Sequence, residues 1–258
     1  MRDWTGSVAF ITGGAQGIGL GIARALGKRG VRLALADVDE EALASSAGEL
    51  AAEVPLDVRD RVAFAAAADR VEAALGPVDL LFNNAGIVPF SVPAELTYDK
   101  WDLSLAVNLT GVVNGVQTFL PRMIRRGAGH IVNTSSAAGL VADPNVLYAT
   151  AKAAVVALSE SLRLTVAKHG VDVSVLCPGP VDTEIVRNTR SFDPTVALHD
   201  DYVPAVDAFL RSGPGIDEVG EMVVAGMEAR SPWIFTGDEV RPHLEERLAA
   251  FLRALPTG

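Results

Sequence analysis

Short apolar runs alternate along the chain with longer segments in which apolar residues recur at helical spacing. Most of the short runs are continuously apolar, a pattern typical of strands covered on both faces, as in a parallel sheet. The predicted strands are Val8–Thr12, Arg32–Ala36, Glu53–Leu56, Val78–Asn83, His130–Thr134, Val173–Cys177 and Trp233–Thr236. The predicted helices are Gly17–Arg29, Asp39–Leu50 with Asp39 as N-cap, Asp60–Leu75, Asp99–Arg126 with a break near Gly111, Leu147–His169, Asp217–Ala229 and Pro242–Leu255.

This regular repetition of strand and helix predicts an α/β fold, a doubly wound parallel sheet with right-handed crossovers. A length of 258 residues fits a single domain over residues 1–258. One segment, Thr183–Pro214, breaks the rhythm and is interrupted by Pro194, Pro204 and Pro214. Because long irregular segments in compact domains are often functional, residues 183–215 are predicted to form a substrate-binding loop or lid.

Apolar residues in and near that segment have two open interpretations. They could form the walls of a substrate pocket, or they could cover the sheet or a subunit contact. The residues concerned are Ile185, Val186, Phe192, Val203, Phe209, Val88, Pro89, Phe90, Leu140 and Val141.

Composition narrows the possible partners. The net charge of −10 argues against a nucleic-acid partner, which usually requires a basic surface. The single Cys177 cannot form an intramolecular disulfide and lies in an apolar run, so we expect a buried thiol in a cytoplasmic protein. No apolar stretch approaches the ~18 residues of a membrane span, and no signal peptide is expected. The four histidines match no metal-binding pattern, so no catalytic metal is expected.

A glycine-rich turn follows the first predicted strand and opens a helix. Gly13, Gly17 and Gly19 have the spacing G-x-x-x-G-x-G. Glycines allow the backbone to approach a pyrophosphate, and the N-terminus of the helix offers free N–H groups and a positive dipole end. The position of the turn at the start of a βαβ unit predicts a nucleotide-binding site.

The end of the second strand predicts which dinucleotide binds. Asp37 lies 18 residues after Gly19, where a carboxylate can accept hydrogen bonds from both ribose hydroxyls and would repel a 2′-phosphate. No lysine or arginine follows it directly. The sequence therefore favours NAD(H) as cofactor over NADP(H).

A candidate proton-transfer pair lies at the start of the helix at 147–169. Tyr148 and Lys152 are four residues apart and therefore share one helical face. At ~4 Å and an effective dielectric constant of ~20, a cation favours the phenolate by ~4 kcal/mol, roughly three pKa units. We therefore expect Lys152 to bring the pKa of Tyr148 near 7, where proton transfer is efficient. Ser135 and Ser136 end the fifth strand, where a serine can stabilise charge on a carbonyl oxygen.

Taken together, these residues resemble the classical short-chain dehydrogenase/reductase family from Val8 to about Gly237. The shared motifs are Thr12–Gly19 for T-G-x-x-x-G-x-G, Asn83-Asn84-Ala85-Gly86 for N-N-A-G, the helix asparagine Asn108, Ser136 before Gly139, Tyr148 with Lys152 for Y-x-x-x-K, and Pro178–Thr183 for P-G-x-V-x-T. Ser136 precedes Tyr148 by 12 residues, whereas 13 is more frequent in the family, so Ser135 is one place nearer the usual spacing.

The resemblance implies a role for each matched residue. Tyr148 transfers the substrate proton, Lys152 lowers the pKa of Tyr148 and holds the nicotinamide ribose, and Ser136 stabilises the substrate oxygen. Asn108 would anchor a water that connects Lys152 to solvent. The implied cofactor-binding residues are Gly13, Gln16, Gly17, Ile18, Gly19, Asp37, Asp57, Val58, Asn84, Ala85, Gly86, Tyr148, Lys152, Pro178, Gly179, Val181 and Thr183.

The family further implies a Rossmann-like sheet of seven parallel strands flanked by helices, and a homotetramer or dimer. The expected activity is hydride transfer between NAD(H) and a small-molecule secondary alcohol or ketone. Two alternatives remain open. One is an NADPH-dependent 3-oxoacyl-(acyl carrier protein)-type ketoreductase, and the other is a non-catalytic dinucleotide-binding protein.

Overall fold

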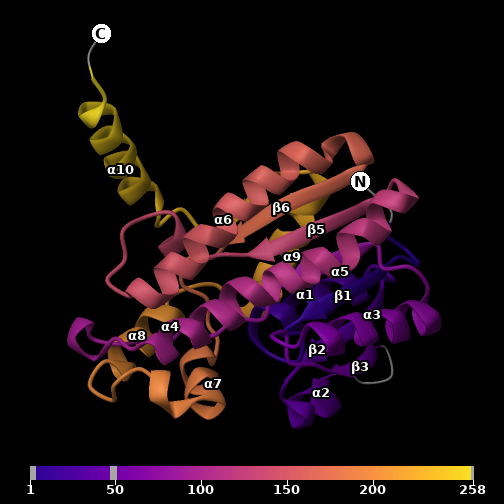
Figure 1. Ribbon diagram of the computed structural model, residues 1–258, viewed down its shortest axis with the longest axis horizontal. Coiled ribbons are helices and arrows are strands. Elements are labelled where there is room, and N and C mark those ends of the chain that lie inside the picture. The colour runs from indigo at the N-terminus through magenta and orange to yellow at the C-terminus, as the bar shows by residue number, and fades with distance from the viewer. Residues whose placement is uncertain (1–3, 47–50, 257–258) are drawn as a thin grey trace.

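Seven parallel strands form a single sheet with helices on both of its faces (Figure 1). The computed structural model describes residues 4–46 and 51–256. The strands are β1 (Val8–Thr12), β2 (Arg32–Asp37), β3 (Ala51–Pro55), β4 (Leu80–Asn83), β5 (Gly129–Thr134), β6 (Val171–Cys177) and β7 (Trp233–Phe235). Their order is β3-β2-β1-β4-β5-β6-β7, so the strand order reverses between β1 and β4. The predicted doubly wound α/β fold is confirmed, with strand ends shifted by at most two residues.

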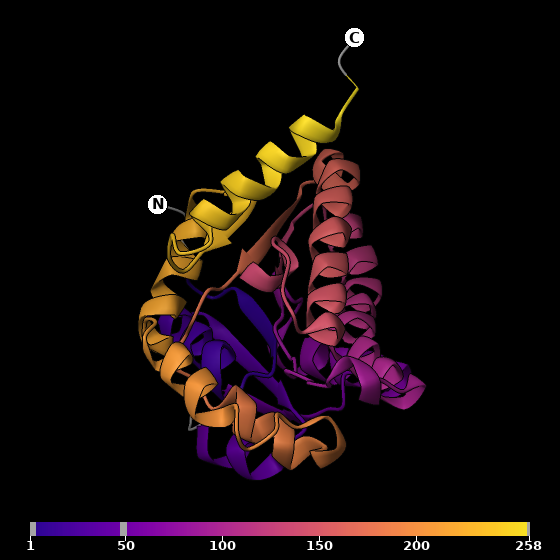
Figure 2. The ribbon, with the colours of Figure 1, turned by 90° about the vertical axis from the view of Figure 1, so that its left-hand side faces the viewer.

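Helices cover both faces of the sheet, whereas the last helix projects from the body (Figures 1 and 2). The helices are α1 (Gly17–Gly27), α2 (Glu40–Ser46), α3 (Arg61–Leu75), α4 (Tyr98–Leu105), α5 (Gly111–Arg126), α6 (Val146–Val166), α7 (Ile185–Phe192), α8 (Val203–Arg211), α9 (Ile216–Glu228) and α10 (Arg241–Ala254). The predicted N-cap of α2 is confirmed, because Asp39 Oδ1 accepts a 2.9 Å hydrogen bond from Ala42 N. The predicted end of that helix, Leu50, lies outside the described residues.

Burial on both faces explains why the strands read as continuous apolar runs. Successive side chains of a strand point to opposite faces, and here each face is covered by helices. Phe10 of β1 contacts Phe64 of α3 and Phe119 of α5, with ring centroids 5.8 and 5.0 Å apart. The next residue, Ile11, belongs to the opposite core, which α1 and α9 cover.

The long helical segment at 98–126 is interrupted where the sequence predicted a break. Residues Ala106–Thr110 form a π-helical turn between α4 and α5. Such turns are often found at functional sites, and this one carries Asn108. On length and composition alone, Tyr98–Arg126 could cross a membrane, but 50% of its most apolar window is buried inside the fold. We therefore describe it as a core helix.

The segment 183–214 differs from the prediction of an irregular loop. It contains α7, a 3₁₀ turn at Pro194–Val196, and α8. The prolines that seemed to break structure lie at helix starts instead. Pro194 opens the 3₁₀ turn, Pro204 lies in the first turn of α8, and Pro214 precedes the N-cap of α9. Proline is well tolerated there because the first N–H groups of a helix have no intrahelical partner.

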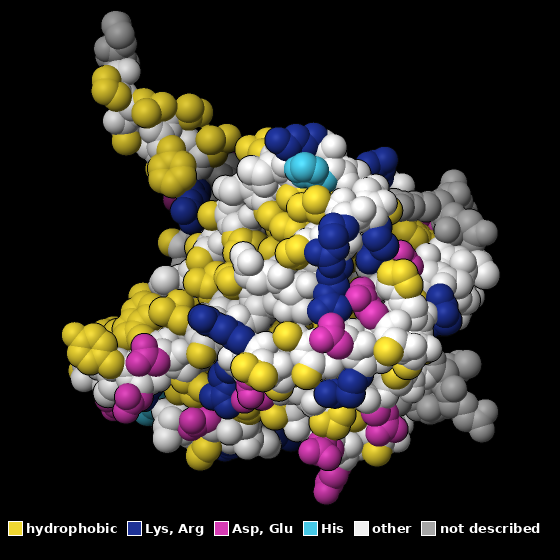
Figure 3. All heavy atoms as spheres, turned by 45° about the vertical axis from the view of Figure 1, so that its right-hand side comes forward, with side chains coloured by type: hydrophobic (Ala, Val, Ile, Leu, Met, Phe, Trp, Pro, Cys, Tyr) yellow, Lys and Arg dark blue, Asp and Glu magenta, His cyan; other side chains and the backbone are white. Residues whose placement is uncertain are grey.

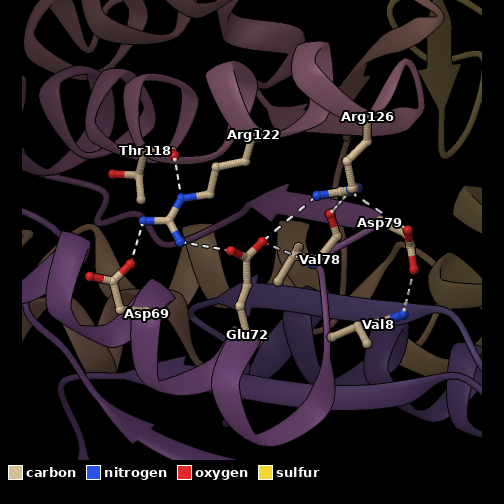
Figure 4. A network of polar contacts seen from close by, with 8 residues as sticks. All are labelled: Val8, Asp69, Glu72, Val78, Asp79, Thr118, Arg122 and Arg126. Atoms are coloured by element: carbon tan, nitrogen blue, oxygen red, sulfur yellow. Dashed lines mark hydrogen bonds and ion pairs between the residues drawn. The ribbon is translucent and has the colours of Figure 1, made fainter.

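An ion-pair network joins α3 to α5 on one face of the sheet (Figure 4). Arg122 contacts Asp69 and Glu72 at 2.7 Å each. Arg126 lies 3.8 Å from Glu72 and 3.7 Å from Asp79. Arg122 and Glu72 are largely buried, so this network contributes more than an isolated surface pair would. It fixes the helix that follows Asn108.

Candidate active site

A groove with a volume of about 1710 Å³ lies at the carboxyl ends of the strands, around the reversal point between β1 and β4. Ligands bind at this position in open α/β sheets. All the residues predicted to bind a dinucleotide line the groove except Gly19, and all the predicted catalytic residues line it except Asn108. The structure therefore brings together residues that are far apart in sequence.

The glycine-rich turn forms one wall of the groove, where backbone segments pack too closely for side chains. A Cβ added at Gly13, whose φ is +61°, would lie 2.9 Å from the Cα of Ala85, and one added at Gly19 would lie 2.0 Å from Gly13 O. Asn84 holds this geometry, since its side-chain amide donates to Thr12 O at 3.2 Å. Gly19 does not line the groove, but its lack of a side chain allows the turn to pack against Gly13 O. The open N-terminus of α1 beside this cradle fits a pyrophosphate.

Carboxylates dominate the end of the groove beside β2. Asp37, Asp39 and Glu41 all line it, and the stretch 37–45 contains no lysine or arginine. Asp37 Oδ2 accepts a 3.2 Å hydrogen bond from Ala15 N. Partial burial raises the pKa of Asp37 above its usual value, although backbone hydrogen bonds oppose the shift. This end fits ribose hydroxyls and is unfavourable for a phosphate group.

The loop after β3 places Asp57 and Val58 in the same part of the groove. Asp57 pairs with Arg59, with 2.6 Å between Oδ2 and the guanidinium, and this contact lowers the pKa of the carboxyl. Val58 is buried and contacts the helix after the π turn, where a Cβ added at Gly111 would lie 2.7 Å from Val58 Cγ2. Contact of either residue with adenine stays a prediction.

The two adjacent serines at the end of β5 have different environments. Ser135 is buried, and its hydroxyl donates a 2.7 Å hydrogen bond to Lys152 O. Ser136 lines the groove and hydrogen-bonds the phenol of Tyr148, which lowers the pKa of that phenol. Its hydroxyl also accepts from Ala138 N at 3.2 Å. Ser136 is therefore the serine that faces the groove and Tyr148, whereas Ser135 holds the strand against α6.

The predicted lowering of the Tyr148 pKa toward 7 is wrong for this structure. Burial of the phenol outweighs every other effect and raises its pKa to about 12, although the hydrogen bond from Ser136 opposes the shift. The charge of Asp143, on the neighbouring loop, adds to the increase. A free phenol this strongly desolvated stays protonated near neutral pH.

The position of Lys152 explains why the expected cation effect does not appear. Its Nζ donates a 3.0 Å hydrogen bond to Thr134 O and lies 5.5 Å from the centroid of the Tyr148 ring, under the ring face. Lys152 is fully enclosed, and burial lowers its own pKa to about 8. The sequence-based expectation assumed a charge pair at ~4 Å and neglected desolvation. Burial disfavours the charged forms of both groups, the ammonium of Lys152 and the phenolate of Tyr148.

Asn108 lies behind the groove wall. Its Oδ1 accepts a 3.0 Å hydrogen bond from Ile87 N, while its buried Nδ2 has no hydrogen-bond partner among the described residues. A Cβ added at Gly86 would lie 3.0 Å from Asn108 Oδ1 and 3.3 Å from Lys152 Nζ, so both groups adjoin the same small space. The predicted water between them stays a prediction.

Helix α7 contributes a contact that the sequence did not predict. Asn188 Nδ2 donates to Gln16 Oε1 at 2.8 Å, and Gln16 Nε2 donates to Asp39 Oδ2 at 2.9 Å. One residue on, Thr189 Oγ1 accepts a 2.9 Å hydrogen bond from Val88 N. Helix α7 thus bridges the two rims of the groove. No local signal marks Asn188, because its partner is 172 residues away.

Apolar side chains line the same groove as Tyr148, which favours the pocket-wall interpretation for many of the candidates. Those that line it are Val88, Phe90, Val141, Ile185, Val186, Phe192 and Phe209. Pro89, Leu140 and Val203 do not. Leu140 packs instead against the core under β6, and the predicted burial of Cys177 in that core is confirmed. The described residues form no cluster suited to a metal ion.

Comparison with known proteins identifies the family. The model for "short chain dehydrogenase" matches residues 7–194. The chain belongs to the short-chain dehydrogenase family. Its relatives in this family include the C alpha-dehydrogenase of Sphingobium sp. (strain NBRC 103272 / SYK-6), which is 36% identical over 269 residues, covering 98% of this chain and 87% of the relative. Oxidoreductase UcpA of Escherichia coli (strain K12) is 39% identical over 210 residues, covering 77% and 80%.

Solved short-chain dehydrogenases share the fold over the whole chain. A short chain dehydrogenase/reductase from Burkholderia phymatum in complex with NAD superimposes with a TM-score of 0.91 at 32% identity, covering 100% of this chain and 99% of that one. Family membership makes this chain an oxidoreductase that binds a nicotinamide dinucleotide, and the seven-stranded Rossmann-like architecture implied by the resemblance is confirmed.

Proposed function

We propose that this short-chain dehydrogenase transfers a hydride between NAD(H) and a secondary alcohol or its ketone. The observation that carries the proposal is the convergence of Ser136, Tyr148 and Lys152 on the groove that also contains the glycine-rich turn and Asp37. The apolar side chains that line this groove fit a small organic substrate whose polar oxygen points to Ser136 and Tyr148.

Three parts of the groove would each bind one part of the dinucleotide. The N-terminus of α1 and the turn at Gly13–Gly19 would hold the pyrophosphate, and Asp37 the adenosine ribose. Lys152, with Asn84–Gly86 and Pro178–Thr183, lines the remaining path. Bound in this way, NAD(H) supplies or accepts the hydride.

The proton is handled by Tyr148. Its raised pKa keeps the phenol protonated near neutral pH, which suits a proton donor to the oxygen of a ketone as that oxygen gains charge. The Ser136 hydroxyl stabilises the same oxygen. Lys152 acts after the phenol loses its proton, because an ammonium 5.5 Å from the ring attracts a phenolate by roughly 3 kcal/mol at an effective dielectric constant of 20. In alcohol oxidation the same groups work in reverse.

Two further parts of the function are proposals of the same kind. The preference for NAD(H) rests on the carboxylates at 37–41, which also disfavour the NADPH-dependent acyl-carrier alternative. The presence of all four family residues, Asn108, Ser136, Tyr148 and Lys152, disfavours a role without catalysis. The buried single cysteine remains compatible with a cytoplasmic location.

The direct test has two arms. Fluorescence titration should show tighter binding of NADH than of NADPH. A panel of secondary alcohols, tested for NAD⁺ reduction, should contain members that support turnover. Equal or tighter binding of NADPH would overturn the cofactor preference. Absence of turnover with every alcohol, and with the matching ketones plus NADH, would overturn the reaction assignment.

A further inference from the structure

The face of helix α8 that lines the groove is apolar. Tyr202, at the N-cap of α8, and Val206, Phe209 and Leu210 within it all line the groove. Positions three or four residues apart share one face of a helix, so these four side chains form a continuous apolar stripe. No residue of α8 is buried, and Tyr202 and Phe209 are 50% and 57% exposed. Exposed apolar surface inside a groove is typical of a ligand-binding site.

The groove has room for a second ligand beside the dinucleotide. Its volume of about 1710 Å³ exceeds the ~300–1,000 Å³ of most small-molecule sites. Val240 and His243, at the base of α10, line the same groove, and Figure 3 shows hydrophobic side chains bordering the hollow between α10 and the body. None of the residues assigned to the dinucleotide lies on α8, so the apolar stripe is left for the substrate.

A chain of contacts connects α8 with the predicted catalytic residues. A Cβ added at Gly86 would lie 3.3 Å from Lys152 Nζ. Four residues on, Phe90 lines the groove, and its ring centroid lies 5.7 Å from that of Tyr202. The backbone N–H of Phe90 donates a 2.8 Å hydrogen bond to Val196 O, which fixes the loop. The stripe on α8 therefore adjoins the loop that passes Lys152.

The rings around the stripe favour an aromatic ligand over an aliphatic one. Phe90, His199 and Tyr202 contact one another, with ring centroids 5.7, 6.2 and 6.5 Å apart. Within residues 4–46 and 51–256, no ring contacts Phe209. Two aromatic rings attract each other by more than their buried area explains, and a rigid ring loses less conformational freedom on binding than an alkyl chain does. A substrate ring would give Phe209 the aromatic contact that the described chain does not provide.

We propose that the substrate carries an aromatic ring and that this ring binds against Phe209, with Tyr202 beside it. The inference rests on the proposed function, since it places the carbinol or carbonyl carbon at Tyr148 and the ring at α8. Phe209 and Tyr202 are then specificity-determining residues that take no part in proton or hydride transfer. The substrate class is an aryl-substituted secondary alcohol or the matching ketone, and its binding buries the exposed ring of Phe209.

Paired alcohols that differ only in the ring test the substrate class. The probes are methyl carbinols, used as both enantiomers, that bear a phenyl or a cyclohexyl ring through one or two methylene groups. The methylene groups insulate the carbinol carbon, so the ring acts through binding. For at least one linker, we expect kcat/KM for NAD⁺ reduction to be about tenfold higher with the phenyl compound, although the cyclohexyl ring is the more hydrophobic. Equal values, or higher values for the cyclohexyl compounds, overturn the proposal.

Substitution of Phe209 tests the site. Phe209→Leu keeps an apolar side chain but removes the ring, so the phenyl-to-cyclohexyl ratio of kcat/KM should fall about threefold or more. The matched control is Phe251→Leu, because Phe251 is also 57% exposed but lies on α10 and does not line the groove. Its ratio should equal that of the wild type. A ratio that Phe209→Leu leaves unchanged overturns the proposal and would leave the stripe to another occupant, such as a second copy of this chain.

Binding without turnover separates this proposal from the proposed function. The matching methyl ketones do not react with NAD⁺, because both compounds are already oxidised, so calorimetric titration into the protein with NAD⁺ measures binding alone. We expect the phenyl ketone to bind more tightly than the cyclohexyl ketone, and Phe209→Leu to lose the difference. Equal binding, or no detectable binding of either ketone, overturns the proposal. Phenyl-selective binding without turnover of any alcohol would instead overturn the reaction assignment and leave the ring site in place.

Discussion

Ser135 and Lys152 are joined by a buried 2.7 Å hydrogen bond, from the serine hydroxyl to the backbone carbonyl of the lysine. The bond holds the end of β5 against the helix that carries both Tyr148 and Lys152. The neighbouring Ser136 faces the groove and contacts Tyr148 instead. The hydroxyl of Ser135 therefore points to α6, and that of Ser136 faces the groove and Tyr148.

Alanine substitutions should separate the roles of the two serines. Ser135→Ala removes a buried hydrogen bond between β5 and α6, so we expect a loss of about 1 kcal/mol in the free energy of unfolding, with turnover largely kept. Ser136→Ala should lower kcat about 10²-fold or more with stability unchanged. Urea denaturation and steady-state kinetics measure both effects, and each variant is the control for the other. The reverse pattern would assign the catalytic role to Ser135.

Removing the buried cation should stabilise the protein while it abolishes turnover. Burial lowers the pKa of Lys152 from 10.5 to about 8, a cost of about 3 kcal/mol, and the hydrogen bond to Thr134 returns about 1. Lys152→Met should therefore gain about 2 kcal/mol in unfolding free energy at pH 7. Lys168→Met, at an exposed lysine, serves as the control.

The pH dependence of that gain has a definite sign. Below pH 8 the lysine is charged in both the folded and the unfolded states, so the full cost is present. Between pH 8 and 10.5 the folded state binds fewer protons than the unfolded state, so wild-type stability rises with pH. The advantage of Lys152→Met should shrink over this range. An advantage that grew with pH would contradict the assigned pKa.

Much of the fold and of the candidate site followed from local patterns in the sequence. The continuous apolar strands, the turn at Gly13–Gly19 and the break before Gly111 each have a cause within a few residues of the feature. The helices within 183–214 were missed because prolines at helix starts resemble breaks in structure. The pKa predicted for Tyr148 was wrong because burial of the phenol depends on the whole surrounding fold. The spacing of two residues along one helix carries no information about that burial.

Cofactor preference should respond to Asp37. Asp37→Asn removes the charge that repels a 2′-phosphate while keeping a hydrogen-bonding side chain of similar size. We expect NADPH binding to tighten by about tenfold, equivalent to ~1.4 kcal/mol of relieved repulsion. Fluorescence titration of both cofactors measures the change, with Asp99→Asn on the exposed first turn of α4 as the control. An unchanged ratio of NADH to NADPH affinity would show that a group other than Asp37 sets the cofactor preference.

Asn188 should govern how long a dinucleotide stays bound. Asn188→Leu removes the 2.8 Å hydrogen bond between α7 and Gln16. A net loss of about 1 kcal/mol predicts faster NADH dissociation, by roughly threefold to tenfold. Stopped-flow displacement of NADH gives the rate, and Ala208→Leu on exposed α8 controls for the added leucine. Dissociation at the wild-type rate would mean that the contact between Asn188 and Gln16 does not hold the cofactor.

The central claim is that the phenol of Tyr148 transfers the substrate proton. Its most direct test is NAD⁺ reduction by Tyr148→Phe with an alcohol that the wild type oxidises, beside Tyr98→Phe, which changes an exposed tyrosine. We expect Tyr148→Phe to bind NADH with wild-type affinity and to lose at least about 10³-fold in kcat, while Tyr98→Phe keeps full activity. Turnover by Tyr148→Phe at the wild-type rate would contradict the claim, whatever its affinity for NADH.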